Sequence, residues 1–196
     1  MEKIEVIEQP TSTLSMNPLK FALWLFMATV VMVFAALTSA YLVRQSDGNW
    51  LIFDMPNIFY VSSLVVILSS VAIQWALWSA KNNEMGQLKI AISLALFLGF
   101  GFLFTQWLSW KELVNVGVFF AGDKSNPSGS FVYVFSGLHA AHIVSGLIYI
   151  FLILIDVFKY KVHSQRLLRI EMCVTYWHFL GALWIYLFLF LVANNH

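Results

Sequence analysis

The stretch SGLHAAHIVSG, residues Ser136–Gly146, lies at the centre of the sequence feature that decides the fold. No Asp, Glu, Lys or Arg occurs between Ser125 and Ile155, and the stretch sits inside this uncharged run. An α-helix rises about 1.5 Å per residue, so the run is long enough to cross the ~30 Å hydrocarbon core of a bilayer. We therefore predict a transmembrane helix here.

The rest of the chain repeats this pattern. Hydrophobic residues make up 60% of the sequence and charged residues only 11%, with a mean hydropathy of +0.79, whereas soluble domains carry about 25% charged residues. Transmembrane strands would be shorter and would alternate, and backbone groups in lipid must be paired internally, so we predict helices. The five expected helices are approximately 21–43, 55–80, 90–110, 129–155 and 172–192.

The sequence thus predicts an all-α integral membrane bundle of five helices over residues 20–196. Residues 1–19 form a polar lead-in without an apolar centre, so we expect no cleavable signal peptide. With the N-terminus inside, the inner side holds Lys3, Lys20, Lys81, Lys89, Lys159, Lys161, Arg166 and Arg169, and the outer side holds Arg44, Lys111 and Lys124. This excess of inner positive charge predicts a cytoplasmic N-terminus and a C-terminus outside.

Three histidines fall inside predicted membrane helices. His139 and His142 are three residues apart and share a helix face, and His178 lies on the last predicted helix. Ionisable residues at membrane depth are costly and need an explanation. One reading is a haem or metal site, in which His139 or His142 would pair with His178 across two helices. The other, which we favour, is neutral histidines hydrogen-bonded between the fourth and fifth helices.

Several other classes of function lack their usual sequence features. The net charge of +1 gives no indication of nucleic-acid binding, and the single cysteine, Cys173, excludes an intrachain disulfide. The first three predicted helices carry no acidic residue at mid-membrane, which argues against a proton-translocating relay in this chain. A small transporter would need helices broken near the midplane, and the predicted segments contain no proline there.

Motifs on four predicted helices together resemble subunit III of the haem-copper oxidases. The segment Gly137–Ile143 is similar to the family's Gly-x-His-x-x-His-Val/Ile, with Gly129-Ser130 ten residues before His139. The segment Tyr176–Phe179 with the later Trp184 resembles the family's Tyr-Trp-His-Phe-Val-Asp-x-x-Trp. Further similarities lie in Trp24–Ala28, Val31-Met32 and Ala40–Leu42, in the leucine- and serine-rich run Leu64–Ser70, and in Glu171 seven residues before His178. The resemblance covers roughly residues 20 to 193.

The chain departs from the family pattern at three acidic positions. Val30, Ser109 and Gly181 stand where the family carries membrane carboxylates. Roles in lipid head-group contact or proton collection that depend on those carboxylates are therefore not expected in this chain. Longer members have seven helices, and the two missing here would be N-terminal. The lipid-filled cleft that they wall would be open in this chain, or walled by another subunit.

The resemblance implies a non-catalytic core subunit of an aa3-type respiratory terminal oxidase, which reduces O2 to water with electrons from cytochrome c and pumps protons. Haem a and copper would belong to subunits I and II, with a small subunit IV also present, and this chain would bind no redox cofactor but would hold structural phospholipid. Cytochrome c would act on the complex rather than on this chain, and the complex would lie in a bacterial cytoplasmic membrane. The alternatives are subunit III of a quinol oxidase and, more distantly, a haem-bearing membrane anchor.

Two groups of residues are the candidate sites. A helix-packing seam is expected to involve His139, His142, Trp177, His178, Glu171 and Gln106. Lipid head groups are expected near the basic inner loop, at Lys159, Lys161, Arg166 and Arg169. The alternative for this loop is that its charges only set the topology. We expect no catalytic residue and no metal ligand in the chain.

Overall fold

A computed structural model describes residues 17–53, 55–123, 125–159 and 164–194, with the side chains of 164–166 excepted. These residues form five α-helices, each long and apolar enough to cross a membrane. The helices are α1 (Pro18–Ser46), α2 (Ile58–Lys81), α3 (Met85–Asn115), α4 (Pro127–Phe158) and α5 (Ser164–Asn194). The predicted all-α bundle of five membrane-spanning helices is confirmed.

Every helix except α2 is longer at both ends than the uncharged run that predicted it. Asn17 and Asn126 explain two of the starts. The side chain of Asn17 accepts a hydrogen bond from Leu19 N at 3.0 Å, and that of Asn126 accepts one from Ser128 N at 3.1 Å. Both are N-caps followed by proline at the first helical position, a favoured start. The lead-in predicted for residues 1–19 therefore ends at Asn17, and residues 1–16 lie outside the described part.

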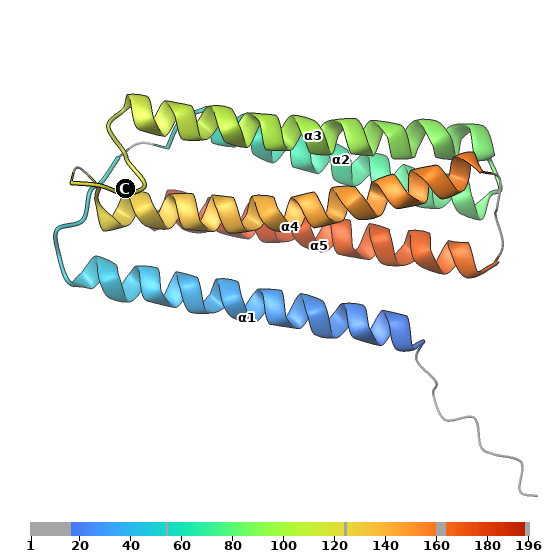
Figure 1. Cartoon of the computed structure of the whole chain (residues 1–196), viewed down its shortest axis with the longest axis horizontal. Coiled ribbons are helices and arrows are strands. Elements are labelled where there is room, and N and C mark those ends of the chain that lie inside the picture. The colour runs from blue at the N-terminus through green and yellow to red at the C-terminus, as the bar shows by residue number, and fades with distance from the viewer. Residues whose placement is uncertain (1–16, 54, 124, 160–163, 195–196) are drawn as a thin grey trace, which may run out of the picture.

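The helices run alternately up and down and form an uneven bundle (Figure 1). Helices α2 and α3 pack against each other most extensively. Helices α4 and α5 lie between this pair and α1, which packs only on α4 and α5 within the described residues. Helix α5 is accordingly the most buried of the five and α1 the least. The weak packing of α1 leaves space between it and α2.

Two tryptophans of α5 form the centre of the core. Trp177 and Trp184 are the largest fully buried side chains. Their indole N–H groups donate to serines of α2, Trp177 to Ser69 Oγ at 3.0 Å and Trp184 to Ser63 Oγ at 3.1 Å. Buried indoles need such acceptors, because an unpaired polar group in lipid or protein interior is costly. These two bonds fix the register of α5 against α2.

Candidate functional site

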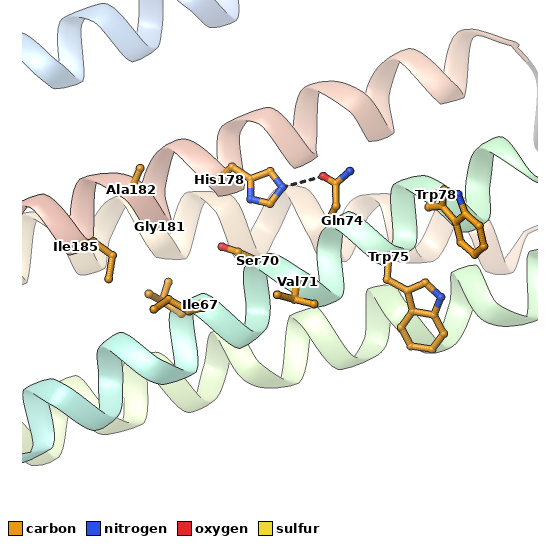
Figure 2. Close-up of a pocket in the computed structure, with 11 residues that line it drawn as sticks. Ile67, Ser70, Val71, Gln74, Trp75, Trp78, His178, Gly181, Ala182 and Ile185 are labelled. Carbon is orange, nitrogen blue, oxygen red and sulfur yellow. Dashed lines mark hydrogen bonds between the residues drawn. The ribbon is translucent and has the colours of Figure 1, made fainter.

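A groove between α2 and α5 opens on the outer surface of the bundle (Figure 2). Its volume is about 660 Å³. Within it His178 Nε2 donates to Gln74 Oε1 at 3.0 Å, and Ser70 lies beside this pair along α2. The remaining lining is apolar or aromatic: Val66, Ile67, Val71, Trp75, Trp78, Gly181, Ala182 and Ile185. The groove is therefore apolar except for Ser70, Gln74 and His178.

The local sequence explains the hollow. Ser70 and Gln74 are four residues apart, as are His178 and Ala182, so each pair lines one face of its helix. Gly181 contributes no side chain, and a Cβ built there would lie 3.0 Å from Ser70 Oγ. Glycine at this position therefore lets the Ser70 hydroxyl approach the α5 backbone at the groove wall.

A second cavity, of about 410 Å³, lies between the N-terminal ends of α1 and α5 and the C-terminal end of α2. Glu171 Oε2 contacts Lys20 Nζ at 3.0 Å, and Glu171 Oε1 contacts Lys81 Nζ at 4.0 Å. Two ammonium groups thus face one carboxylate, and the local charge is positive. Gln74 and His178 line this cavity as well as the groove, so the charged cavity and the apolar groove adjoin at this hydrogen-bonded pair.

The histidines of α4 face a different part of the molecule. His139 is fully buried and lies among the rings of Phe34, Phe102 and Trp184, with ring centroids 6.5, 5.7 and 5.2 Å away. His142 is half-buried and its Nδ1 donates to the Leu138 carbonyl oxygen at 2.8 Å. Neither ring faces the groove.

Of the six predicted seam residues, His139 and Trp177 lie in the contact between α4 and α5, whereas His178 and Glu171 do not. Helix α4 meets α5 through Ser145, whose hydroxyl lies 2.7 Å from Tyr176 Oη, and through Gly146, which abuts Trp177. His178 does not take part, because successive residues of a helix diverge by ~100° and Trp177 already occupies the direction of the core. His178 thus faces α2, which differs from the expected hydrogen bonding between the fourth and fifth helices. Glu171 faces α1 and α2 at the bundle end.

Only two of the four basic residues predicted to contact lipid head groups have described side chains. Lys159 is exposed at the end of α4, and Arg169 pairs with Asp156 at 3.5 Å. Lys161 and the side chain of Arg166 lie outside the described part. Sequence reasoning missed Lys20, Lys81 and Gln74 as a group. A signal existed, since the predicted topology puts Lys20, Lys81 and Glu171 at the same membrane surface, directly beside their apolar runs.

No redox centre has an evident set of ligands here. Among the described residues, no three His, Cys, Asp or Glu side chains gather as a metal site would require. A bis-histidine haem would need His139 or His142 opposite His178, and these rings face different neighbours. The three histidines that the structure describes therefore do not fit a haem between α4 and α5.

A family model described as cytochrome c oxidase subunit III matches residues 8–194. The chain belongs to the subunit III family. It is therefore a multi-pass membrane protein and a subunit of a haem-copper oxidase complex.

Relatives of two kinds match over most of the chain. Cytochrome c oxidase subunit 3 of Bacillus sp. (strain PS3) is 25% identical over 170 residues, which is 84% of this chain and 80% of that protein. Cytochrome bo(3) ubiquinol oxidase subunit 3 of Buchnera aphidicola subsp. Baizongia pistaciae is 26% identical over 172 residues, 85% and 87% of the two chains. The corresponding protein of Buchnera aphidicola subsp. Schizaphis graminum is 27% identical over 184 residues, 89% and 93% of the two chains.

Proposed function

We propose that this chain is the non-catalytic subunit III of an aa3-type oxidase that transfers electrons from cytochrome c to O2 and pumps protons. Haem a and copper would be held by subunits I and II, with a small subunit IV also present. Support comes from the relatives named as cytochrome c oxidase subunits and from the dispersed histidines, which do not converge on a ligand. A quinol oxidase is the alternative, because relatives of that kind match equally well.

The proposed role is to stabilise subunit I and to hold structural phospholipid. The observation that carries the lipid role is that the charged cavity adjoins the apolar groove at Gln74 and His178. A phospholipid phosphate would lie between Lys20 and Lys81, and one acyl chain would follow the groove past Ser70. Anionic lipid surfaces attract each nearby lysine by about 1 kcal/mol, which suits a cavity with excess positive charge.

The depth of the cavity agrees with this assignment. Gln74 precedes Lys81 by seven residues, which is about 10 Å along the helix at ~1.5 Å per residue. The headgroup region on each side of a bilayer is roughly 5–8 Å thick. The glycerol ester groups would therefore reach the Gln74–His178 pair. If the chain is oriented with its N-terminus in the cytoplasm of a bacterial cell, the bound lipid would belong to the inner leaflet.

Purification of the intact complex through a tag on this chain tests membership and electron donor. We expect subunits I and II, haem a and copper to co-purify, and the complex to oxidise reduced cytochrome c. Preferential oxidation of a quinol would establish the alternative. Removal of this chain should leave O2 reduction largely intact at first. An immediate loss of turnover with haem and copper retained would contradict a non-catalytic role.

Charge removal tests the lipid role. We expect Lys20→Gln with Lys81→Gln to weaken retention of anionic phospholipid by about 25-fold, because each lysine contributes about 1 kcal/mol and every 1.4 kcal/mol is tenfold. Lys111→Gln is the matched control, since Lys111 lies over the Trp107 ring on α3. Mass spectrometry of lipid extracted from the complexes gives the retained amounts. Equal lipid content in both variants would exclude the site.

A further inference from the structure

The core of the bundle contains polar atoms whose hydrogen-bonding capacity is unused. Gln106 on α3 and His139 on α4 are 1% and 0% exposed. Within the described residues, neither the amide oxygen nor the amide nitrogen of Gln106 has a hydrogen-bond partner, and neither does either ring nitrogen of His139. Buried polar side chains are almost always paired in native proteins, because an unpaired one loses its hydration without compensation. Two such side chains therefore need a common explanation.

Contacts among α3, α4 and α5 define a neighbouring layer of the core, about two helical turns from Gln106. A Cβ built on Gly99 of α3 would lie 2.5 Å from Leu147 Cδ2 of α4 and 2.8 Å from Trp177 Cη2 of α5. These three positions thus meet at one level, with α3 facing both α4 and α5. Seven residues make almost two whole helical turns, so a step of seven returns to the same face about 10 Å along the axis.

The next layer is reached by this step on all three helices. It leads from Gly99 to Gln106, from Leu147 to Ala140 and from Trp177 to Trp184. His139 is adjacent to Ala140, and its ring contacts Trp184 at 5.2 Å between centroids. It also contacts Phe102, one turn before Gln106 on the same face of α3. Gln106 and His139 therefore lie in the same layer on facing sides of α3 and α4.

A direct bond between the two side chains would not satisfy them. A neutral histidine has one donor and one acceptor, and a primary amide has two donors and one carbonyl acceptor. One Gln106–His139 bond would leave a ring nitrogen and an amide atom unpaired. A water molecule carries two donors and two acceptors, and buried waters typically make about three hydrogen bonds to such groups.

We propose that Gln106 and His139 form a binding site for a buried water molecule, enclosed by Phe34, Phe102 and Trp184. The water accepts a hydrogen bond from one side chain and donates to the other, which links α3 to α4. The aromatic rings close the site to lipid. This site is separate from the lipid cavity and does not depend on which electron donor the complex uses.

The wild-type oxidase complex gives the first test. A cryo-EM map fine enough to resolve ordered water should contain a peak within about 2.7–3.2 Å of a polar atom of both side chains. Side chains surrounded only by carbon, or a direct contact with no water peak, would overturn the proposal. This measurement needs no variant and therefore does not depend on assembly of a mutant.

A double-mutant cycle in the same complex gives the second test. Gln106→Leu and His139→Phe should each lower the temperature at which the subunit leaves the complex, because each leaves the other residue and the water under-paired. The double variant should dissociate at a higher temperature than either single variant, since replacing both partners by apolar groups removes the unpaired atoms. Additive losses would mean that the residues do not share a site and would overturn the proposal.

Discussion

Two glutamine–histidine sets occur in this bundle, and they differ in what surrounds them. Gln74 and His178 are joined by a 3.0 Å hydrogen bond at the edge of an open groove. Gln106 and His139 are buried, the His139 ring lies against Phe102 and Trp184, and neither side chain makes a hydrogen bond within the described chain. The groove set can exchange partners with lipid or water from outside, whereas the core set depends on what was trapped when the helices packed. The two sets contain the same residue types, so they differ because of the helix face from which each side chain projects.

A glycine accompanies each set and lets neighbouring side chains approach the helix backbone. Gly99 lies one layer from the core set and allows Leu147 and Trp177 to approach the α3 backbone. Gly181 lies beside the groove set and allows the Ser70 hydroxyl to approach the α5 backbone. The contact is tighter in the core, where a Cβ would lie 2.5 Å from Leu147, than at the groove, where it would lie 3.0 Å from Ser70.

The largest expected effect comes from adding one methyl group to the core. Gly99→Ala would bring Cβ within 2.5 Å of Leu147 and 2.8 Å of the buried Trp177 ring. Overpacking of this kind typically costs about 1–3 kcal/mol, so the subunit should leave the complex at a clearly lower temperature. Thermal dissociation in detergent followed by size-exclusion chromatography measures this.

Two glycine variants serve as controls for that measurement. Gly101→Ala should be neutral, because its nearest neighbour would be Val65 Cγ1 at 3.8 Å. Gly181→Ala should cost less than Gly99→Ala, because its close neighbour is the Ser70 hydroxyl at 3.0 Å, at the edge of the open groove. Equal losses from Gly99→Ala and Gly181→Ala would show that the groove is as tightly packed in the complex as the core.

The sequence predicted the number of helices because that number depends only on the length of the uncharged runs along the chain. A long uncharged run must cross the bilayer whatever its neighbours are. Helix ends were less predictable, because the helices continue past charged residues. Helix α1 includes Lys20, which pairs with Glu171, and α3 includes Lys89, whose ammonium group lies over the Phe158 ring. Helix α5 likewise begins at Ser164, well before the predicted residue 172, and includes Arg169, which pairs with Asp156.

The neighbour of a polar helix face could not be predicted from spacing alone. Ser63, Ser70 and Gln74 are seven and four residues apart and share a helix face, yet only Ser63 accepts a hydrogen bond from a core tryptophan. Ser70 and Gln74 line the groove, and the second tryptophan donates to Ser69, which lies outside this spacing. Spacing along one helix says which residues share a face, but not which neighbour that face meets. His178 was therefore expected to hydrogen-bond between the fourth and fifth helices, but its partner is Gln74 on α2.

A moderate effect is expected from the tryptophan–serine bonds that hold α5 on α2. Trp184→Phe removes the indole donor and leaves Ser63 without it. Interhelical hydrogen bonds in membranes are worth about 0.6–1.7 kcal/mol, so a moderate loss of thermal stability should result. Ser63→Ala made in the Trp184→Phe background should lower thermal stability by less than it does in the wild-type chain, because the bond between the two residues is already lost. Trp78→Phe, on the exposed face of α2, should leave stability unchanged, and a loss there equal to that of Trp184→Phe would contradict the core assignment.

The smallest effect is expected from the groove set itself. Gln74→Leu or His178→Leu breaks the 3.0 Å bond, but the remaining polar atom faces an opening where water or a lipid ester group can replace the lost partner. We expect each variant to lower the stability of the subunit by at most about 0.6 kcal/mol, the average for such bonds in membrane helices. The haem content of the complex should be unchanged in the reduced-minus-oxidised spectrum. A loss as large as that of Gln106→Leu would mean that a dry partner surface covers the groove in the complex. The difference between the two sets would then lie in the isolated subunit only, and the lipid assignment would have to be given up.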